Sequence, residues 1–181
     1  MNTYEYKKKM FEEVRDIPFE IVFGASIDYQ KAIESLKIHK KAGCTSKHLY
    51  LGNFYEKLGS KVLYLTYIFY WEDQEFLNRH LKNLSKNLPE RYHLALKVDN
   101  ELIDATFDKF LAPIFPVNEF ENCEVSVVYV DKIEHHTVQE RIEYVKSKTK
   151  NMNELLKFYE ELNRYLIKIR NKNKKTYHRK S

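Results

Sequence analysis

Alternation of side-chain character between residues 92 and 98 constrains the fold of this chain more than any other feature. The even positions from 94 to 98 are leucine, leucine and valine, which is the two-residue period of a β-strand with one buried face. Asp99-Asn100 follows as a plausible two-residue turn, and Glu101 to Thr106 can return as the second strand. The sequence therefore predicts a β-hairpin over residues 92–106.

The register of this hairpin places two polar residues on one face. With a two-residue turn, Val98 opposes Glu101 and Ala95 opposes Asp104. His93 then lies on the same face as Asp104, as a diagonal neighbour about 7–8 Å away between backbones. An imidazole and a carboxylate can close that gap, so contact between His93 and Asp104 is predicted. A three-residue loop would put the two side chains on opposite faces.

Cys44 stands at the start of a predicted helix. Gly43 precedes it, Gly59 supplies a C-terminal stop, and apolar residues recur between them at helical spacing, namely Leu51, Phe54, Tyr55 and Leu58. In the first turn of a helix, the unpaired N–H groups and the positive end of the dipole favour thiolate over thiol. The same N–H groups could receive an oxyanion. Cys44 is thus a candidate nucleophile, with His93 as base and Asp104 as orienting carboxylate.

Three segments, in this order, resemble the Cys, His and Asp boxes of the transglutaminase-like superfamily. They are Gly43-Cys44-Thr45 at a helix start, Tyr92 to Val98, and Leu102 to Thr106. Val14 to Pro18 is similar to the segment that precedes the Cys helix in small prokaryotic members, so the resemblance covers roughly residues 11–117. It implies an α+β core with helices on an antiparallel sheet.

The resemblance also implies a papain-like triad of Cys44, His93 and Asp104. The superfamily includes protein cross-linking acyltransferases, peptidases, glycopeptide amidases and proteins that have lost catalysis. The expected reaction is acyl transfer from an amide or ester of a protein or peptide, through a thioester, with no cofactor and no metal. Hydrolysis and transamidation share every residue up to the last step. The Cys and Asp boxes lack the tryptophans often found in the enzymes, so the alternative is a catalytically silent scaffold that binds a partner through its C-terminal helix and basic tail.

Other residues have supporting or competing roles. Gln30 is the candidate oxyanion donor, and Trp71 and His48 are candidates for the substrate cleft. His48 lies four residues after Cys44 on the same helix face, so it is alternatively a thiol partner, half of a metal pair or a packed core residue. Trp71 could wall a cleft or simply pack. The adjacent pair His135-His136 is a weak metal signal because neighbouring residues point in different directions.

The basic residues are concentrated at the C-terminus. Seven of them and no acidic residue follow Ile167, so the net charge of +5 resides in this segment and the rest is near neutral. We expect one transglutaminase-like domain over residues 1–167 and a basic tail over 168–181, disordered at its end, that attracts nucleic acid only non-specifically. Neither a signal-peptide pattern nor a membrane-length apolar run is visible, and two cysteines cannot form a disulfide scaffold. A reducing cytoplasm and no membrane association are therefore expected.

The remaining elements follow from periodicity and breakers. Helices are predicted over residues 4–14, 28–41, 44–58, 74–87, 138–148 and 153–168, and strands over 61–71 and 123–130 in addition to the hairpin. Residues 107–121, with two prolines, should be irregular. Cys123 opens the 123–130 strand and is expected in the core. Helices that precede an antiparallel sheet indicate the α+β class.

Overall fold

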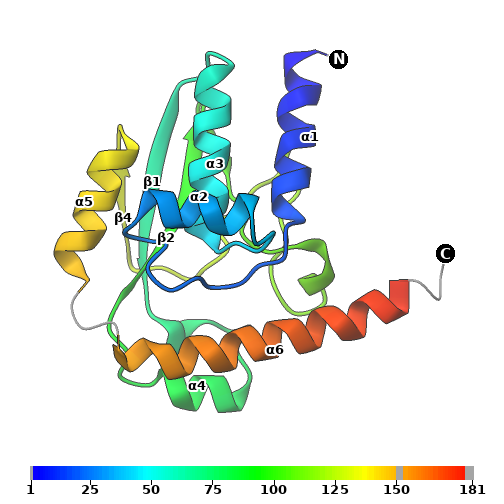
Figure 1. The fold of residues 1–181 in the computed structure, drawn as a ribbon, viewed down its shortest axis with the longest axis vertical. Helices are drawn as coiled ribbons and strands as arrows, with labels where there is room; N and C mark the ends of the chain where they lie inside the picture. The colour runs from blue at the N-terminus through cyan, green and yellow to red at the C-terminus, as the bar shows by residue number, and fades with distance from the viewer. Residues whose placement is uncertain (1, 150–152, 178–181) are drawn as a thin grey trace.

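The computed structural model describes residues 2–149 and 153–177, and it has the predicted α+β class (Figure 1). Its antiparallel sheet has the order β3-β2-β1-β4, with β1 Val62–Phe69, β2 Arg91–Val98, β3 Glu101–Ile103 and β4 Asp131–His135. The helices around it are α1 Thr3–Arg15, α2 Tyr29–Lys37, α3 Cys44–Lys57, α4 Arg79–Ser85, α5 Val138–Lys148 and α6 Asn153–Tyr177. Two short 3-10 helices, η1 Trp71–Asp73 and η2 Lys109–Leu111, complete the described elements.

The β2–β3 hairpin has the predicted turn and register. Asp99 and Asn100 both have positive φ angles, 50° and 77°, as a type I′ turn requires. Val98 pairs with Glu101, and the ladder ends after three pairs at Ile103. The next residue, Asp104, therefore leaves the strand on the face that the parity rule predicts.

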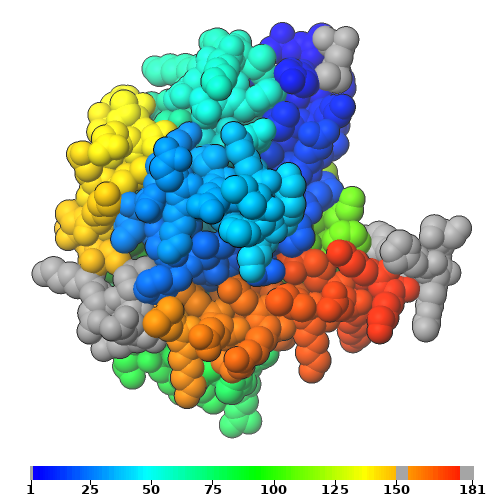
Figure 2. Space-filling model, viewed as in Figure 1, coloured from blue at the N-terminus to red at the C-terminus, as the bar shows by residue number. Residues whose placement is uncertain are grey.

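One group of helices covers the sheet, α5 packs on β1 and β4, and a second group lies at one end of the molecule. α3 packs on β1 and β2, with α1 and α2 packed against it, and this group shares a core that includes Phe11, Leu49, Tyr64, Leu94 and Leu96. α6 runs across one end of the molecule with α4 beneath it and packs on η2 (Figure 1). This second group has its own aromatic core, which includes Trp71, Phe107, Leu111, Phe158 and Leu162. Figure 2 shows α2 (blue) on the front of the molecule, flanked by α5 (yellow) and α6 (orange).

The predicted strand over residues 123–130 is wrong, since that segment is irregular and the strand follows it as β4. Several of its backbone groups bond to side chains, and only at its end does Val130 N–H donate to the Ile68 carbonyl of β1, at 2.8 Å. Ser126 N–H donates to Asp104 at 2.8 Å. The amide of Gln74 clamps Val128, because its Nε2 donates to the Val128 carbonyl at 2.9 Å and its Oε1 accepts from the Val128 N–H at 2.9 Å. Cys123 is half-buried in this irregular segment.

The helix predicted over residues 74–87 is shorter than expected and spans only α4. Asn78 caps it, accepting a hydrogen bond from Leu81 N–H at 2.9 Å. Gln74 stands outside the helix because both ends of its amide hold other segments, the Tyr70 and Val128 backbones.

α6 continues past its predicted end at residue 168 to Tyr177. Arg170, which the sequence assigns to the tail, is buried and forms an ion pair with Asp108 at 2.8 Å. Asn173 donates to the Phe110 carbonyl at 2.8 Å. The expected boundary at 168 therefore falls inside a helix that packs on the body, while residues 178–181 lie outside the described residues. No helix in the described part of the chain is long and apolar enough to cross a membrane.

Candidate active site

Cys44 occupies the first position of α3, as predicted, on the floor of a cleft. Gly43 is the N-cap of the helix and has no side chain that could accept a hydrogen bond. The first N–H groups of α3 therefore have no hydrogen-bond acceptor from a cap side chain. A Cβ at Gly43 would come within 3.3 Å of the Glu20 carbonyl oxygen. This glycine therefore lets the chain around Glu20, one edge of the cleft, pass close to the head of α3.

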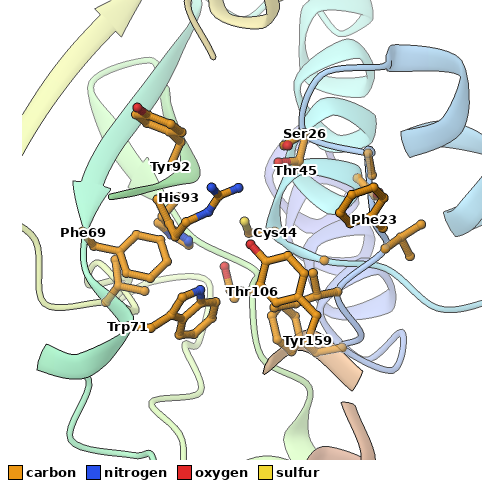
Figure 3. Close-up of a pocket in the computed structure, with 18 of the residues that line it drawn as sticks. Phe23, Ser26, Cys44, Thr45, Phe69, Trp71, Tyr92, His93, Thr106 and Tyr159 are labelled. Atoms are coloured by element: carbon orange, nitrogen blue, oxygen red, sulfur yellow. The ribbon is translucent and has the colours of Figure 1, made fainter. Parts of the chain in front are cut away.

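The structure brings Cys44, His93 and Asp104 together in the predicted order. His93 Nε2 donates to Asp104 Oδ2 at 2.8 Å, and the imidazole lies close enough to the Cys44 sulfur to lower the pKa of the thiol. His93 comes from the middle of β2 and Asp104 from the end of β3, so the hairpin register aligns the base with its carboxylate. Figure 3 shows the Cys44 sulfur between His93 on one side and Tyr159 on the other.

Asp104 is held as a carboxylate by a dense set of donors. Its Oδ1 accepts from the Thr106 hydroxyl at 2.5 Å and the Thr106 N–H at 3.2 Å, and Oδ2 accepts from Ser126 N–H at 2.8 Å. Burial raises the pKa of Asp104, but the His93 charge and hydrogen bond, with smaller effects from His48 and Thr106, lower it well below its usual range. Asp104 therefore remains an anion that orients the His93 imidazole and favours its protonated form.

The thiol and the imidazole favour their charged forms together. Burial raises the pKa of Cys44, but the charge and hydrogen bond of His93, the Leu94 N–H and the charge of Arg141 outweigh it, so the pKa lies below its ordinary value. Burial lowers the pKa of His93, yet the Asp104 and Cys44 charges and their hydrogen bonds raise it to about 10. The pair therefore titrates as a thiolate and imidazolium.

His48 lies behind Cys44 rather than in the cleft. Its Nδ1–H donates to the Cys44 carbonyl at 2.8 Å, and its Nε2 accepts from Ala105 N–H at 2.8 Å. Both nitrogens are therefore occupied, and burial lowers the pKa of His48 to about 4, which keeps the ring neutral. The ring bonds to the backbone of Cys44 rather than to its thiol, and it ties α3 to the segment after Asp104.

The cleft walls are aromatic. Trp71 both lines the cleft and packs in the aromatic core, so it fits both alternatives that the sequence left open. The other rings that line the cleft come from distant segments, namely Phe19, Phe23, Phe69, Tyr92, Phe107 and Tyr159. Tyr159 comes from α6, hydrogen-bonds to Arg91, and directs its hydroxyl toward the Cys44 sulfur (Figure 3). The cleft is narrow, with a cavity volume of about 80 Å³.

Gln30 does not reach the site. It is the second residue of α2, is exposed to solvent and does not line the cleft. The backbone donor that acts on the sulfur is the Leu94 N–H, and the N–H groups at the head of α3 have no side-chain cap.

Two buried cationic side chains next to the site, Lys47 and Arg141, were not predicted from the sequence. Lys47 is fully buried and donates to the carbonyls of Arg15 at 2.7 Å and Thr106 at 2.9 Å, and burial lowers its pKa to about 7. Arg141 is also fully buried and donates to the Ser26 carbonyl and the Thr45 hydroxyl. A signal existed for both, since Lys47 precedes Leu51 by one helical turn and Arg141 shares the apolar face of α5 with Val145.

Among the described residues no cluster of His, Cys, Asp and Glu side chains could hold a metal ion. Comparison of the chain with protein-family models, with curated proteins and with solved structures finds no match. The function must therefore be inferred from the chemistry of the site itself.

Proposed function

We propose that this chain is a transglutaminase-like cysteine enzyme that transfers an acyl group from an amide or ester through a thioester on Cys44. The observation that carries the proposal is the position of the His93 ring, which lies beside the Cys44 sulfur in one cleft and is hydrogen-bonded to the buried carboxylate of Asp104. Three residues far apart in sequence meet there with the geometry that nucleophilic catalysis requires.

In the first half-reaction the proton of Cys44 is on His93, at the nitrogen that does not face Asp104. The thiolate attacks the substrate carbonyl carbon, the C–S bond forms, and the carbonyl electron pair moves onto oxygen. On collapse, the C–N or C–O bond breaks, and the leaving amine or alcohol takes the proton from His93. The uncapped N–H groups at the head of α3 would donate hydrogen bonds to the developing oxyanion.

In the second half-reaction a water molecule or an amine gives a proton to His93 and attacks the thioester. The C–S bond breaks, the Cys44 thiolate returns, and the product is a carboxylic acid or a new amide. The aromatic walls suit an extended, partly apolar acyl donor such as a protein or peptide side chain. The choice between water and amine depends on what the cleft admits.

Acyl-enzyme trapping with an activated ester tests this function. Brief incubation with p-nitrophenyl acetate should acetylate Cys44, detected by peptide mass spectrometry as a hydroxylamine-sensitive adduct. C44S should abolish the adduct, and H93N should slow its formation by about 10²-fold because the base is lost. C123S is the matched control and should acylate at the wild-type rate.

Absence of an adduct on Cys44, or an equal rate in H93N, would contradict the enzyme proposal. The alternative, a silent scaffold, would then be favoured. The exposed position of Gln30 supports the silent-scaffold alternative, because it removes the side-chain oxyanion donor expected from the sequence.

A further inference from the structure

Arg141 is a fully buried guanidinium that forms no ion pair within the described part of the chain. Two other buried arginines have the usual arrangement: Arg170 pairs with the carboxylate of Asp108 at 2.8 Å, and Arg15 pairs with acidic side chains. A buried cation without a counter-charge is unfavourable, so the position of Arg141 calls for an anion nearby.

The guanidinium lies directly behind the wall of the catalytic cleft. One nitrogen donates to the Ser26 carbonyl at 2.5 Å, another to the Thr45 hydroxyl at 3.3 Å, and Nε has no partner within the described residues. Ser26 and Thr45 both line the cleft, and Figure 3 shows them side by side above the Cys44 sulfur. Arg141 therefore joins α5 to the head of α3 at the residue that follows the nucleophile.

The Cys44 thiolate is the anion that this location offers. Burial lowers the pKa of Arg141 to about 10, the charge of Cys44 raises it, and Arg141 in turn lowers the pKa of Cys44. The other titratable neighbour, His135 on β4, has a pKa lowered by burial and then by Arg141, so it adds no counter-charge. Arg141 stays protonated at neutral pH and faces a thiol whose anion it favours.

We propose that Arg141 is a positioning residue of the proposed enzyme: acting through Thr45 and Ser26, its buried guanidinium balances the charge of the Cys44 thiolate and holds the head of α3 against the cleft wall. This role rests on the proposed function. During acyl transfer the negative charge moves from sulfur to the adjacent oxygen, and the fixed guanidinium remains beside it.

The pH profile of Cys44 alkylation separates this role from a purely structural one. We would measure iodoacetamide labelling of Cys44 from pH 5 to 9 in the wild type, R141M, R141K and K146M. R141M should move the inflection up by about one pH unit, which is a tenfold slower reaction below the inflection. R141K should retain most of the shift because it keeps the charge. K146M removes an exposed cation from the same helix and should change the rate less than twofold.

Equal inflections in the wild type and R141M would overturn the inference, as would R141K behaving like R141M with only a lower melting temperature. A reciprocal test covers the case in which R141M does not fold. C44S removes the thiolate and leaves the guanidinium unbalanced, so it should lower the melting temperature at pH 8 by several degrees more than C123S does. Equal melting temperatures for C44S and C123S would contradict the role of Arg141.

Failure of this inference is distinguishable from failure of the proposed function. If wild-type Cys44 is unreactive at neutral pH, the enzyme proposal fails. If it reacts and acylates while the R141M profile is unchanged, only the role of Arg141 fails.

Discussion

Cys44 and Cys123 are both half-buried, free thiols, yet their surroundings act on them in opposite ways. Burial raises the pKa of both. At Cys44 the imidazolium of His93 outweighs it, and the pKa falls below its usual value. At Cys123 burial dominates and raises the pKa to about 12, and the sulfur merely donates to the Glu119 carbonyl at 3.3 Å.

Asp104 acts on both thiols, but in different ways. At Cys123 burial is the main cause of the raised pKa; a hydrogen bond from the Asp104 backbone lowers the pKa, and the Asp104 charge raises it by a smaller amount. At Cys44 the same charge acts through His93, which it keeps protonated. An imidazole placed between a carboxylate and a thiol thus reverses the sign of the influence of the carboxylate. The comparison shows that the reactivity of a cysteine in this fold depends on its polar neighbours rather than on its depth.

The largest expected difference is in alkylation rate. At pH 7 a thiol with a pKa near 12 is ionised to about one part in 10⁵, whereas a thiol with a pKa below 9 is ionised to more than about one part in 100. Iodoacetamide should therefore label Cys44 at least about 10³-fold faster than Cys123. Peptide mass spectrometry after timed quenching measures both sites in one sample, and comparable rates would remove the basis of the comparison.

Lowering the pH should lower the free energy of unfolding, because protonation of His48 disrupts the link between α3 and the segment after Asp104. Because burial lowers its folded pKa to about 4 from an ordinary value near 6.5, the unfolded chain binds the proton first, and stability is lost as pH falls through that window. We expect the free energy of unfolding in urea to drop by about 2 kcal/mol between pH 7 and pH 5 from this group.

H48Q, which cannot be protonated, should show a drop smaller by that amount. H136Q, at an exposed histidine after β4, is the matched control and should behave like the wild type. If H48Q and the wild type have the same pH dependence, His48 is not the acid-sensitive link between α3 and the segment after Asp104.

Neutralising Asp104 should reduce the difference in alkylation rate between Cys44 and Cys123. D104N removes the charge that supports the His93 imidazolium, so less Cys44 thiolate is present, and alkylation of Cys44 at pH 7 should slow by about tenfold. The rate at Cys123 should not fall, because the same carboxylate raises its pKa. T106V removes one hydrogen bond to Asp104 but no charge and is the control. A parallel loss at both cysteines would indicate a general change in folding.

Removing residues 171–181 should change stability and cysteine labelling least among these variants. The deletion spares the buried Arg170–Asp108 pair but removes the Asn173 hydrogen bond to Phe110 and the Lys174 ammonium 5.0 Å above the Phe110 ring. We expect a loss of about 1 kcal/mol in the free energy of unfolding and an unchanged ratio of Cys44 to Cys123 labelling. A change in that ratio would mean that the end of α6 acts on the cleft, to which Tyr159 of the same helix already belongs.

Several structural features of this protein depend on neighbouring residues only, so they could be predicted from the sequence alone. The turn at Asp99-Asn100 and the two-residue period set the hairpin register, because both depend on a few neighbouring residues, and the register brings His93 to Asp104. The α3 start at Cys44 follows from helical periodicity, with Gly43 immediately before it. These features needed no knowledge of distant contacts.

Tertiary structure decided the rest, because the deciding partners are far apart in the chain. Residues 123–130 have strand composition, but the side chains of Asp104 and Gln74 accept the N–H groups of Ser126 and Val128, and pairing with β1 begins only at Val130. Gln30 points to solvent because of where α2 packs, and Arg170 is buried only because Asp108 meets it. The burial of Arg141 beside Thr45, the residue after Cys44, also depends on the docking of α5. A local pattern can indicate that a charged residue faces inward, but only the assembled fold supplies its partner.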